Sequence, residues 1–301
     1  MIRVAELSRP GHLEPNFSVV IPTHDRPGYL SEAVESVLAQ RRASLECLVV
    51  DDGSHLPLPR WDDPRVRVLR HEVARGPGAA RNAGMRAARG RYIAFLDDDD
   101  LYAPTRLSTV EQYLSPTTAV VCWSQSIGAS SASGRLLFGD ESHRILDGPT
   151  PQIGTVTLPR EVCPRFDERL RLNQDVEWWL RMAHAIRLFT VPYALHRFRE
   201  HGNPRVTDQA EARVCYSKML MEKHREYFAA HPRARAFRLR RMALISLANQ
   251  DTRAALPFFV RSFRAAPSAK AAAHVLRAVA MGVWTLNLPW RVGRPRDRRT
   301  M

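Results

Sequence analysis

Four consecutive aspartates, residues 97–100, are the part of the sequence best suited to chemistry. They follow the apolar residues 92–96, which predict a buried strand that ends in four carboxylates. Neighbouring like charges repel by about 1 kcal/mol or more at a few ångströms, so such a cluster needs a stabilising partner. A divalent cation is one candidate, because hard cations such as Mg²⁺ bind carboxylate oxygens together with substrate phosphates. The alternative is a solvated loop in which Asp100 only caps the next helix.

The other polar residues with chemical potential also follow expected strands. These strands cover residues 17–22, 45–50, 66–69 and 92–96, with helices between them. Strands that alternate with helices predict an α/β fold with a doubly wound, mostly parallel sheet and helices on both faces. Ligands of such sheets bind at the carboxyl ends of the strands, where these polar loops would gather.

Each of these loops also has a simpler interpretation. Residues 51–54 (DDGS) suit a turn, since Asp, Gly and Ser all favour turns. Residues 76–78 (GPG) suit a loop before a helix. Neither G-x-G-x-x-G nor G-x-x-x-x-G-K-[ST] occurs, so Rossmann and P-loop chemistry are not indicated. Three acidic or glycine-rich loops at successive strand ends together favour a nucleotide site.

The composition is that of a globular protein with one large or two small domains. The chain has 301 residues, of which 45% are apolar and 25% are charged. Residues 1–15 lack the apolar core of a signal peptide, and no run of about eighteen apolar residues predicts a membrane-spanning helix. The four cysteines have no metal-binding spacing and are expected to be reduced. We therefore expect a cytoplasmic protein.

The net charge is concentrated in the last third of the sequence. Residues 1–204 contain 25 arginines and 25 acidic residues. Residues 205–301 contain 20 basic and 6 acidic residues, which accounts for the whole net charge of +14. This asymmetry predicts a separate C-terminal unit that meets an anionic partner.

Four sequence blocks occur in a characteristic order. They are SVVIPTHDRP (residues 18–27), VVDDGS (49–54), GPGAARNAG (76–84) and FLDDDD (95–100). In this order and spacing they resemble family 2 of the inverting glycosyltransferases, over about residues 17–207. The resemblance implies a GT-A fold and a nucleoside diphosphate sugar as the donor, with UDP as the expected nucleotide and dTDP as the alternative.

The resemblance also implies which residues bind the donor. They are Pro22, Thr23, Asp25 and Arg26 in the first loop, then Asp52, Arg81, Asp97 and Asp98. Asp52 matches an acid that accepts a hydrogen bond from the base, and Arg81 matches a residue that binds the nucleotide and the diphosphate. The family's usual Tyr-Asn before the first arginine is replaced here by His24 and Asp25, which changes the expected contact to the base.

A metal centre is implied by the same resemblance. Asp97 and Asp99 match the DxD signature, with Asp99 expected to contact the metal most directly and Asp97 expected nearer the ribose. The phrase FREH (residues 198–201) is similar to a late Tyr-Arg-x-His motif, so His201 is a further expected ligand. His196 is expected to be structural. The cofactor is expected to be Mn²⁺ or Mg²⁺, and an imidazole ligand suits Mn²⁺ better.

A second chemical centre lies in residues 166–181 (FDERLRLNQDVEWWLR). A helix is expected from about residue 174, and Asp175 would lie in its first turn, where the helix dipole favours a carboxylate. Taken alone, Asp175 is an ordinary helix-terminal acid. The resemblance implies that it is the general base, although Gln174 replaces the acid that usually precedes it. Trp178 is expected on the acceptor side as a stacking face, and the alternative is a core tryptophan.

Two regions are expected. Residues 1–207 would form the GT-A domain, with its nucleotide-sugar half at about 16–123 and its acceptor half at about 124–207. Residues 208–301 would form a basic region with helices at about 209–229, 237–247, 251–267 and 268–288. Residues 268–301 combine an apolar stripe, tryptophans and arginines, which predicts peripheral contact with the anionic inner face of the membrane. The alternative is a helix packed on the catalytic domain.

These patterns together predict a metal-dependent inverting glycosyltransferase with an acceptor hydroxyl activated by a base. The acceptor is left open between a saccharide, a lipid-linked molecule and a small molecule. One alternative is an inactive sugar-nucleotide binder or scaffold, which would not need Asp97, Asp99 and Asp175. A nucleotidyltransferase is less well supported, because the first strand is not followed by a glycine-rich loop with a lysine or arginine. The sequence has no zinc, RRM or KH signature, so a nucleic-acid partner is not expected.

Overall fold

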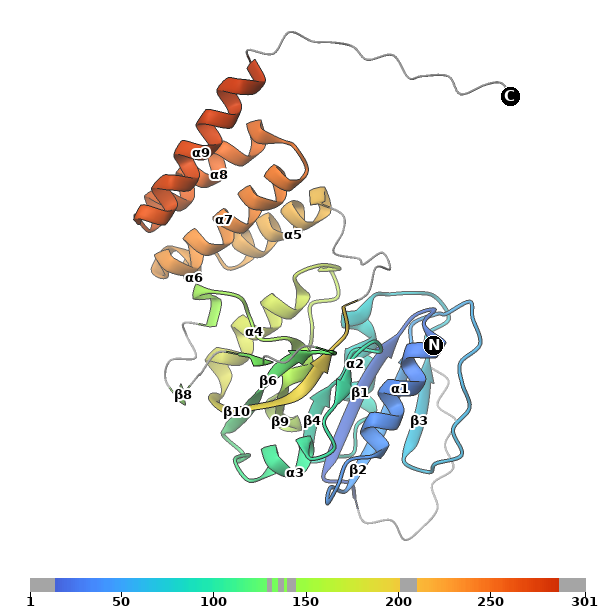
Figure 1. Ribbon diagram of the computed structural model, residues 1–301. Helices are drawn as coiled ribbons and strands as arrows, with labels where there is room; N and C mark the ends of the chain where they lie inside the picture. Colours follow the sequence, from blue (N-terminus) through green and yellow to red (C-terminus); the bar gives the residue numbers. More distant parts are fainter. Residues whose placement is uncertain (1–13, 129–131, 135–137, 140–144, 201–209, 287–301) are drawn as a thin grey trace, which may run out of the picture. The chain divides into compact units, whose positions relative to one another are not determined.

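A computed structural model describes residues 14–128, 132–134, 138–139, 145–200 and 210–286. The chain divides into two compact units, Met1–Asp208 and Gln209–Met301. The first unit is built around a large sheet, and the described part of the second unit is helical (Figure 1).

One half of the sheet consists of four parallel strands. They are β1 (Phe17–Thr23), β2 (Leu45–Asp51), β3 (Val66–Arg70) and β4 (Tyr92–Phe95). β1 pairs with β2 and β4, and β2 pairs with β3. Every residue of β1 and β2 is buried, which is typical of parallel strands covered on both faces. These four strands are those expected from the sequence.

The other half of the sheet is mixed. It contains β9 (Val156–Pro159), β6 (Thr118–Ser126), β10 (Arg187–Phe198) and β5 (Leu101–Tyr102), in the overall order β3-β2-β1-β4-β9-β6-β10-β5. β9 runs antiparallel to both β4 and β6, whereas β6 and β10 run parallel. The sheet is therefore mostly parallel, as expected, with an antiparallel strand that joins its two halves.

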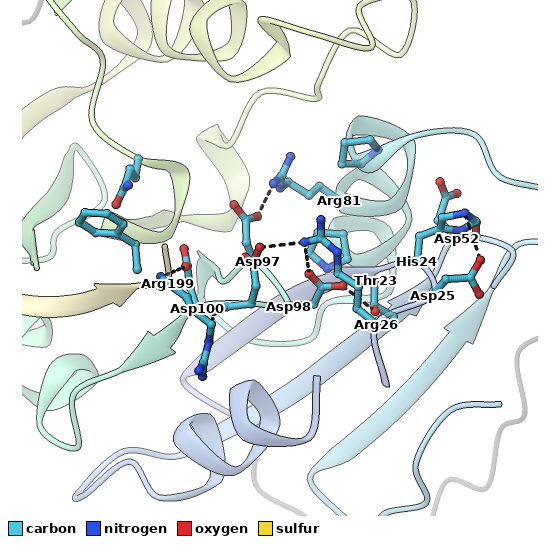
Figure 2. A pocket seen from close by; sticks show the side chains of 15 residues that line it. Thr23, His24, Asp25, Arg26, Asp52, Arg81, Asp97, Asp98, Asp100 and Arg199 are labelled. Atoms are coloured by element: carbon cyan, nitrogen blue, oxygen red, sulfur yellow. Dashed lines mark hydrogen bonds and ion pairs between the residues drawn. The ribbon is translucent and has the colours of Figure 1, made fainter. Parts of the chain in front are cut away.

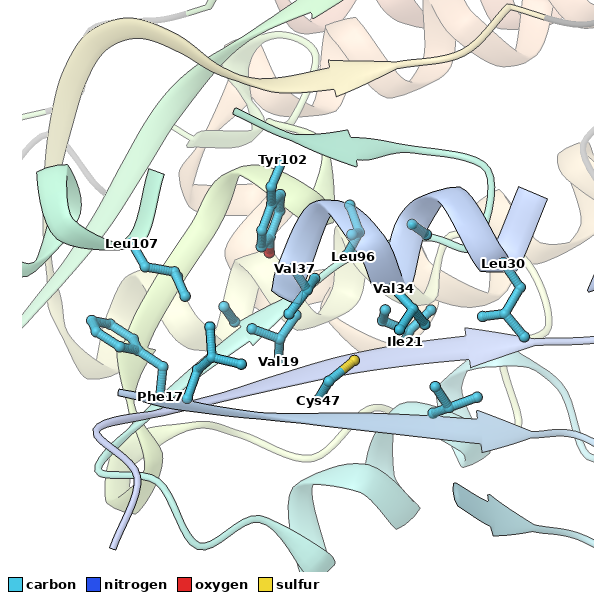
Figure 3. Close-up of a cluster of buried hydrophobic side chains, with 14 of the residues drawn as sticks. Phe17, Val19, Ile21, Leu30, Val34, Val37, Cys47, Leu96, Tyr102 and Leu107 are labelled. Carbon is cyan, nitrogen blue, oxygen red and sulfur yellow. The ribbon is translucent and has the colours of Figure 1, made fainter. Parts of the chain in front are cut away.

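Helices cover both faces of this sheet. Successive side chains of a strand point to opposite faces. Val19 belongs to the core cluster that contains the apolar face of α1 (Pro27–Leu38), shown in Figure 3. Val20 points the other way, where α2 (Pro77–Ala87) packs so closely that a Cβ on Gly84 would stand 2.4 Å from a methyl group of Val20. The expected arrangement of helices on both faces is confirmed.

Strand β10 was not expected from the sequence, although it has 12 residues. Proline cannot donate to a strand ladder, so Pro192 argues against a strand at this position. The structure accommodates Pro192 at an irregularity, because the register with β6 shifts between Val191 and Ala194. The bulge allows the chain to continue as a strand to Phe198, which lines the cavity described below.

Short elements complete the first unit. A single short helix, α3 (Arg106–Glu111), lies between β5 and β6. Between β6 and β9 the structure describes two short strands, β7 (Ala132–Ser133) and β8 (Phe138–Gly139). β7 pairs with β6, and β8 pairs with β10.

The described part of the second unit is made of five helices. They are α5 (Ala210–Lys223), α6 (Arg225–Ala230), α7 (Pro232–Ala248), α8 (Thr252–Ala265) and α9 (Ala269–Leu286). The single helix expected at about residues 209–229 is broken at His224, which caps α6. Met242, Phe259 and Ala278 belong to the core shared by α7, α8 and α9. Among the described residues, no helix is long and apolar enough to cross a membrane.

Several large apolar residues of these helices are exposed. Met219 on α5 and Phe263 on α8 are 44% and 36% exposed. Leu276 and Val279, which belong to the apolar stripe expected in residues 268–301, are 70% and 44% exposed. The sequence beyond residue 286, including the basic end of the expected membrane contact, lies outside the described residues.

Candidate active site

A cavity of about 650 Å³ lies at the carboxyl ends of β1, β2 and β4. Its lining residues come from segments far apart in the sequence (Figure 2): Pro22, Thr23, His24, Asp25, Arg26, Asp52, Pro77, Arg81, Asp97, Asp98, Asp99, Asp100, Gln152, Phe198 and Arg199. The structure thus brings together all the residues expected to bind the donor. In Figure 2, His24, Asp25 and Asp52 gather at one end of this group, and Asp100 and Arg199 lie at the other.

The four aspartates alternate in exposure. The side chains of Asp97 and Asp99 are 40% and 16% exposed, whereas those of Asp98 and Asp100 are 9% and 10% exposed. This alternation gives the DxD spacing a physical meaning, because residues two apart offer the more accessible carboxylates. The less exposed acids, Asp98 and Asp100, have structural partners within the protein.

Asp98 and Asp100 are buried carboxylates with protein partners. Burial raises the pKa of Asp98 to about 6, although the hydroxyl of Thr23, which donates to it at 2.8 Å, opposes the shift. Burial also raises the pKa of Asp100, against the effect of His196, whose Nε2 lies 3.1 Å from a carboxylate oxygen. His196 is fully buried, in keeping with the structural role expected for it.

Two arginines neutralise the exposed acids. Arg81 donates to Asp97 at 2.5 Å, and Arg26 donates to Asp99 at 2.7 Å. Arg26 also lies 3.4 Å from Asp98. Arg81 is only 5% exposed and packs 5.4 Å above the ring of Phe166, so its position is fixed by the core. The cavity therefore has acidic groups and immobilised cations side by side.

The acidic part of the cavity fits a hard divalent cation. Asp97 and Asp99 offer carboxylate oxygens, which are the ligands that Mg²⁺ and Mn²⁺ prefer, and both line the same cavity. Two carboxylates leave coordination positions for the phosphates of a nucleotide, which Arg26 and Arg81 are placed to bind. The expected ligand His201 lies outside the described residues.

Asp52 is buried and holds the loop that leads into α2. It accepts hydrogen bonds from Nδ1 of His71 at 2.7 Å and from the backbone N–H groups of Arg75 and Gly76. Gly76 has φ +97°, a conformation that favours glycine, and its N–H lies 2.6 Å from Asp52. Asp52 therefore shapes the cavity wall as well as lining it.

Asp175 lies at the start of α4 (Gln174–Ala185), as expected, and is partly exposed. The preceding Gln174 is buried against α2, because a Cβ on Gly78 would stand 2.3 Å from its Oε1. The N-termini of α2 and α4 are therefore adjacent, which brings Asp175 near the α2 turn that supplies Pro77 to the cavity. Asp175 itself is not among the cavity-lining residues.

Trp178 was expected on the acceptor side, and this expectation is wrong. Its side chain is fully buried, stacks on Phe166 at 5.5 Å and meets Phe95 edge-on. Its indole N–H donates to the backbone oxygen of Pro164 at 2.7 Å. Trp179 is also fully buried, so both tryptophans anchor α4 instead of offering a face to a ligand.

Three residues of this region were not singled out from the sequence. His71 directly follows β3, and the rule that polar residues after strands gather at one edge would have found it. Arg199 lines the cavity, and its backbone N–H donates to Asp100 at 3.0 Å. It belongs to the FREH motif, in which only the histidine was expected to have a role. Gln152 also lines the cavity, and no sequence signal marked it.

Comparison with known families identifies the domain that carries this cavity. The model of the family described as Glycosyl transferase family 2 matches residues 18–151. This part of the chain belongs to glycosyltransferase family 2. The family 2 match includes the donor residues expected between Pro22 and Asp99.

Relatives of the family 2 domain are also named as glycosyltransferases. An "uncharacterized glycosyltransferase" of Rickettsia felis is 30% identical over 202 residues, which cover 62% of this chain and 33% of that protein. The Escherichia coli protein WfgD, named as a UDP-Glc:alpha-D-GlcNAc-diphosphoundecaprenol beta-1,3-glucosyltransferase, is 36% identical over 94 residues, covering 30% of this chain and 37% of that protein. The chain spans about a third of the length of these relatives.

Solved structures share the fold over most of the chain. S. aureus TarS 1-349 in complex with UDP-GlcNAc gives a TM-score of 0.63 at 17% identity, covering 92% of this chain and 93% of that one. The mannosyltransferase PcManGT of Pyrobaculum calidifontis, in complex with GDP-Man and Mn²⁺, gives 0.59 at 19% identity, covering 93% and 84%. The GT-A-like fold expected from the sequence is thereby confirmed.

Proposed function

We propose that the family 2 domain transfers a sugar from a nucleoside diphosphate sugar to an acceptor hydroxyl. The observation that carries this proposal is the pairing of Asp97 with Arg81 and of Asp99 with Arg26 in one cavity. Acidic groups for a cation and fixed cations for phosphate are the complementary halves of a nucleoside diphosphate site. The named activities of the relatives point to the same reaction class.

Asp97 and Asp99 would hold Mn²⁺ or Mg²⁺, with His201 as a further proposed ligand. When bound, the cation stabilises the negative charge that grows on the departing diphosphate. Arg26 and Arg81 would release their aspartate partners and bind the phosphate oxygens. Because Arg81 is buried and packed on Phe166, its charge is already oriented towards the cavity before the donor arrives.

Asp52 is the proposed contact to the nucleotide base. Three protein donors contact Asp52, and the N–H of Arg75 is shared between its two oxygens. Asp52 also lines the cavity, and uracil and thymine offer an N–H beside their carbonyl groups that such a carboxylate would accept. We therefore propose UDP as the nucleotide, with dTDP as the alternative. The rest of the cavity surface around the base and the ribose would be formed by Pro22, Thr23 and Asp25.

Asp175 is the proposed general base. An acceptor hydroxyl is a poor nucleophile until a base takes its proton as the new bond forms. Asp175 is partly exposed at the N-terminus of α4, next to the α2 turn that ends at the cavity. One base and one cation are enough for a single in-line displacement, so we propose inversion at the anomeric carbon.

The name of one family 2 relative supports a lipid-linked acceptor. The name of WfgD states that it glucosylates a sugar attached to diphosphoundecaprenol. We propose that the acceptor of this protein is likewise presented at a membrane surface. The exposed Leu276 and Val279 on α9, in a unit of high positive charge, support a membrane-facing role for this helix.

A donor-binding screen tests the proposed function. Thermal unfolding would be followed with UDP, dTDP and GDP sugars, each with Mn²⁺, with Mg²⁺ and with EDTA. The proposal expects stabilisation by a uridine or thymidine diphosphate sugar that is lost in EDTA. Incubation of the best donor with lipid-linked saccharides, followed by mass spectrometry, then reports transfer. If the donor binds but neither sugar transfer nor hydrolysis of the donor is detected, the protein is an inactive binder instead.

A further inference from the structure

Three side chains from two loops converge beside the cavity. His24 and Asp25 follow β1, and His55 follows β2. Their ligand atoms lie within 4.8 Å of one another: one carboxylate oxygen of Asp25 is 3.0 Å from Nδ1 of His55 and 3.5 Å from Nε2 of His24. In the part of the chain that the structure describes, this is the one group of three or more such residues arranged to hold a metal ion.

The ring of His24 is oriented by the backbone. Its Nδ1 lies 3.0 Å from the carbonyl oxygen of Asp52, which accepts a hydrogen bond from that nitrogen. Nδ1 is thereby engaged with the backbone, and the other ring nitrogen, Nε2, faces Asp25. Metal-binding histidines commonly donate their second ring nitrogen to a carbonyl or carboxylate in this way.

The carboxylate of Asp25 is equally fixed. Its Oδ1 accepts the backbone N–H groups of His55 at 2.6 Å and Leu56 at 2.9 Å, and its backbone N–H donates to Ser54. The other oxygen, Oδ2, is the one that faces both imidazole rings. Asp25 has φ +55°, a backbone conformation that non-glycine residues rarely adopt and that the surrounding contacts must impose.

The spacings match a coordination shell. Ligands held about 2.0–2.2 Å from a zinc ion lie about 3.4 Å apart in a tetrahedron and about 3 Å apart in an octahedron. The two separations from Asp25, 3.5 Å and 3.0 Å, are close to this range, and all three ligand atoms lie within 4.8 Å of one another. The hydrogen bond between His55 and Asp25 leaves out the third group, Nε2 of His24, which faces the same carboxylate oxygen at 3.5 Å.

We propose that His24, Asp25 and His55 bind a first-row transition-metal ion such as Zn²⁺. This site is distinct from the acidic block, the four aspartates at residues 97–100. Two imidazoles and one carboxylate suit Zn²⁺ far better than Mg²⁺, which prefers oxygen ligands. The site lies at the end of the cavity opposite Asp100 and Arg199 (Figure 2). The ion would tie the loop after β1 to the loop after β2 and so fix the end of the cavity lined by His24 and Asp25. The proposal does not rest on the proposed function.

Calorimetric titration of Zn²⁺ into the full-length protein tests the site. The titration uses an Asp97→Asn/Asp99→Asn background, so that the acidic block cannot contribute. One equivalent of Zn²⁺ is expected to bind, with no competition from excess Mg²⁺. His55→Gln is expected to weaken binding by more than the about 10- to 100-fold that loss of an outer-shell partner costs. His55 is 86% exposed, so this change leaves the fold intact.

Two further variants make the outcome decisive. Asp25→Asn keeps a residue that tolerates positive φ but removes the charge, and it is expected to weaken binding as His55→Gln does. His184→Gln, which changes an exposed histidine on α4, serves as the matched control and is expected to bind Zn²⁺ unchanged. Substituting Co²⁺ gives a second readout, since its visible absorption changes when the hydrated ion enters a protein site of lower coordination number. Unchanged Zn²⁺ affinity in His55→Gln and Asp25→Asn, or equal loss in His184→Gln, would overturn the proposal.

Discussion

The side-chain oxygen of Gln174 lies so close to Gly78 that a Cβ added to this glycine would stand only 2.3 Å from it. Gly78 belongs to the first turn of α2, and Gln174 begins α4, so the pair joins the helix that carries Arg81 to the helix that carries Asp175. A side chain at position 78 would therefore have to displace the amide of Gln174.

Gly78→Ala is therefore expected to reduce sugar transfer more than stability. Alanine gains up to about 1 kcal/mol of helix propensity over glycine, which offsets the cost of displacing the flexible Gln174 amide. The displaced amide would move the start of α4, and with it Asp175, relative to Arg81. Turnover and thermal unfolding of the variant would be measured together.

Gln174→Ala in the same chain is the matched test of this contact. The double variant has room for the added methyl group, so turnover is expected to recover relative to Gly78→Ala alone. If the effects of the two substitutions on turnover are simply additive, the packing of Gln174 over Gly78 does not set the position of Asp175.

The metal proposal predicts that Asp99→Asn abolishes the cation dependence of nucleotide binding. In the wild-type chain, EDTA is expected to weaken UDP binding by about tenfold or more, which corresponds to ~1.4 kcal/mol. In the variant, calorimetric titrations of UDP with Mn²⁺ and with EDTA should give the same affinity. Asp62→Asn, a change of an exposed acid outside the cavity, is the control and should keep the wild-type difference. Equal UDP affinity in both conditions for the wild-type chain would contradict the metal assignment.

Asp175→Asn is expected to retain donor binding and lose transfer. A positioned general base contributes about two to four orders of magnitude to turnover, and the asparagine amide cannot take the proton. Binding of the nucleotide sugar by calorimetry and turnover by product analysis separate the two effects. Glu161→Gln, at an exposed acid before α4, controls for a general change of charge. Turnover close to that of the wild-type chain would remove Asp175 from the mechanism.

Much of the first unit could be predicted because its signals are local. The strands β1 to β4 are apolar runs that end in turn residues, and the polar residues after them converge because the strands are parallel. The residues expected to bind the donor, from Pro22 to Asp99, line one cavity because of that geometry. No long-range information was needed beyond the order of the blocks.

The features that were missed depend on contacts between distant segments. Strand β10 contains Pro192, which is tolerated only because a register shift with β6 accommodates it. Trp178 has the composition of a sugar-stacking residue, and its burial follows from Phe95 and Phe166, which lie far away in the sequence. The approach of His55 to His24 and Asp25 depends on two loops whose conformations no periodicity encodes.

Arg106 provides a stability test of the core between the two halves of the sheet. Its side chain is fully buried, lies 4.0 Å from the ring centroid of Tyr102 and donates to Thr157 and to the backbone oxygens of Gly154 and Val156. Arg106→Met fills a similar volume but leaves these acceptors unsatisfied, so we expect a loss of about 3 kcal/mol in the free energy of unfolding.

Arg160→Met is the matched control for Arg106→Met. Arg160 also donates to a backbone oxygen, that of Ala88 at 2.7 Å, but it is exposed. Its replacement is expected to cost less than about 1 kcal/mol, since water can satisfy the carbonyl. Urea unfolding of both variants gives the comparison. Similar losses for the two arginines would show that burial is not what makes Arg106 important.

The exposed apolar residues of α9 predict binding to anionic membranes. Leu276 and Val279 are 70% and 44% exposed on a helix whose other side packs into the core of the second unit through Ala278. Anionic lipid adds roughly 1 kcal/mol per basic residue near the surface, and residues 205–301 carry the whole net charge of +14. We expect the full-length chain to cosediment with anionic vesicles at low salt and to remain in the supernatant with neutral ones.

Leu276→Asp combined with Val279→Asp is expected to reduce the vesicle-bound fraction severalfold, because the change removes apolar contact and adds repulsion from anionic lipid. Leu244→Asp is the matched control, since Leu244 is 41% exposed on α7, and it should leave binding close to that of the unmodified chain. If the unmodified chain and both variants bind equally, the attraction is electrostatic and α9 does not enter the interface. If the unmodified chain fails to cosediment with anionic vesicles, the exposed stripe does not face a membrane at all.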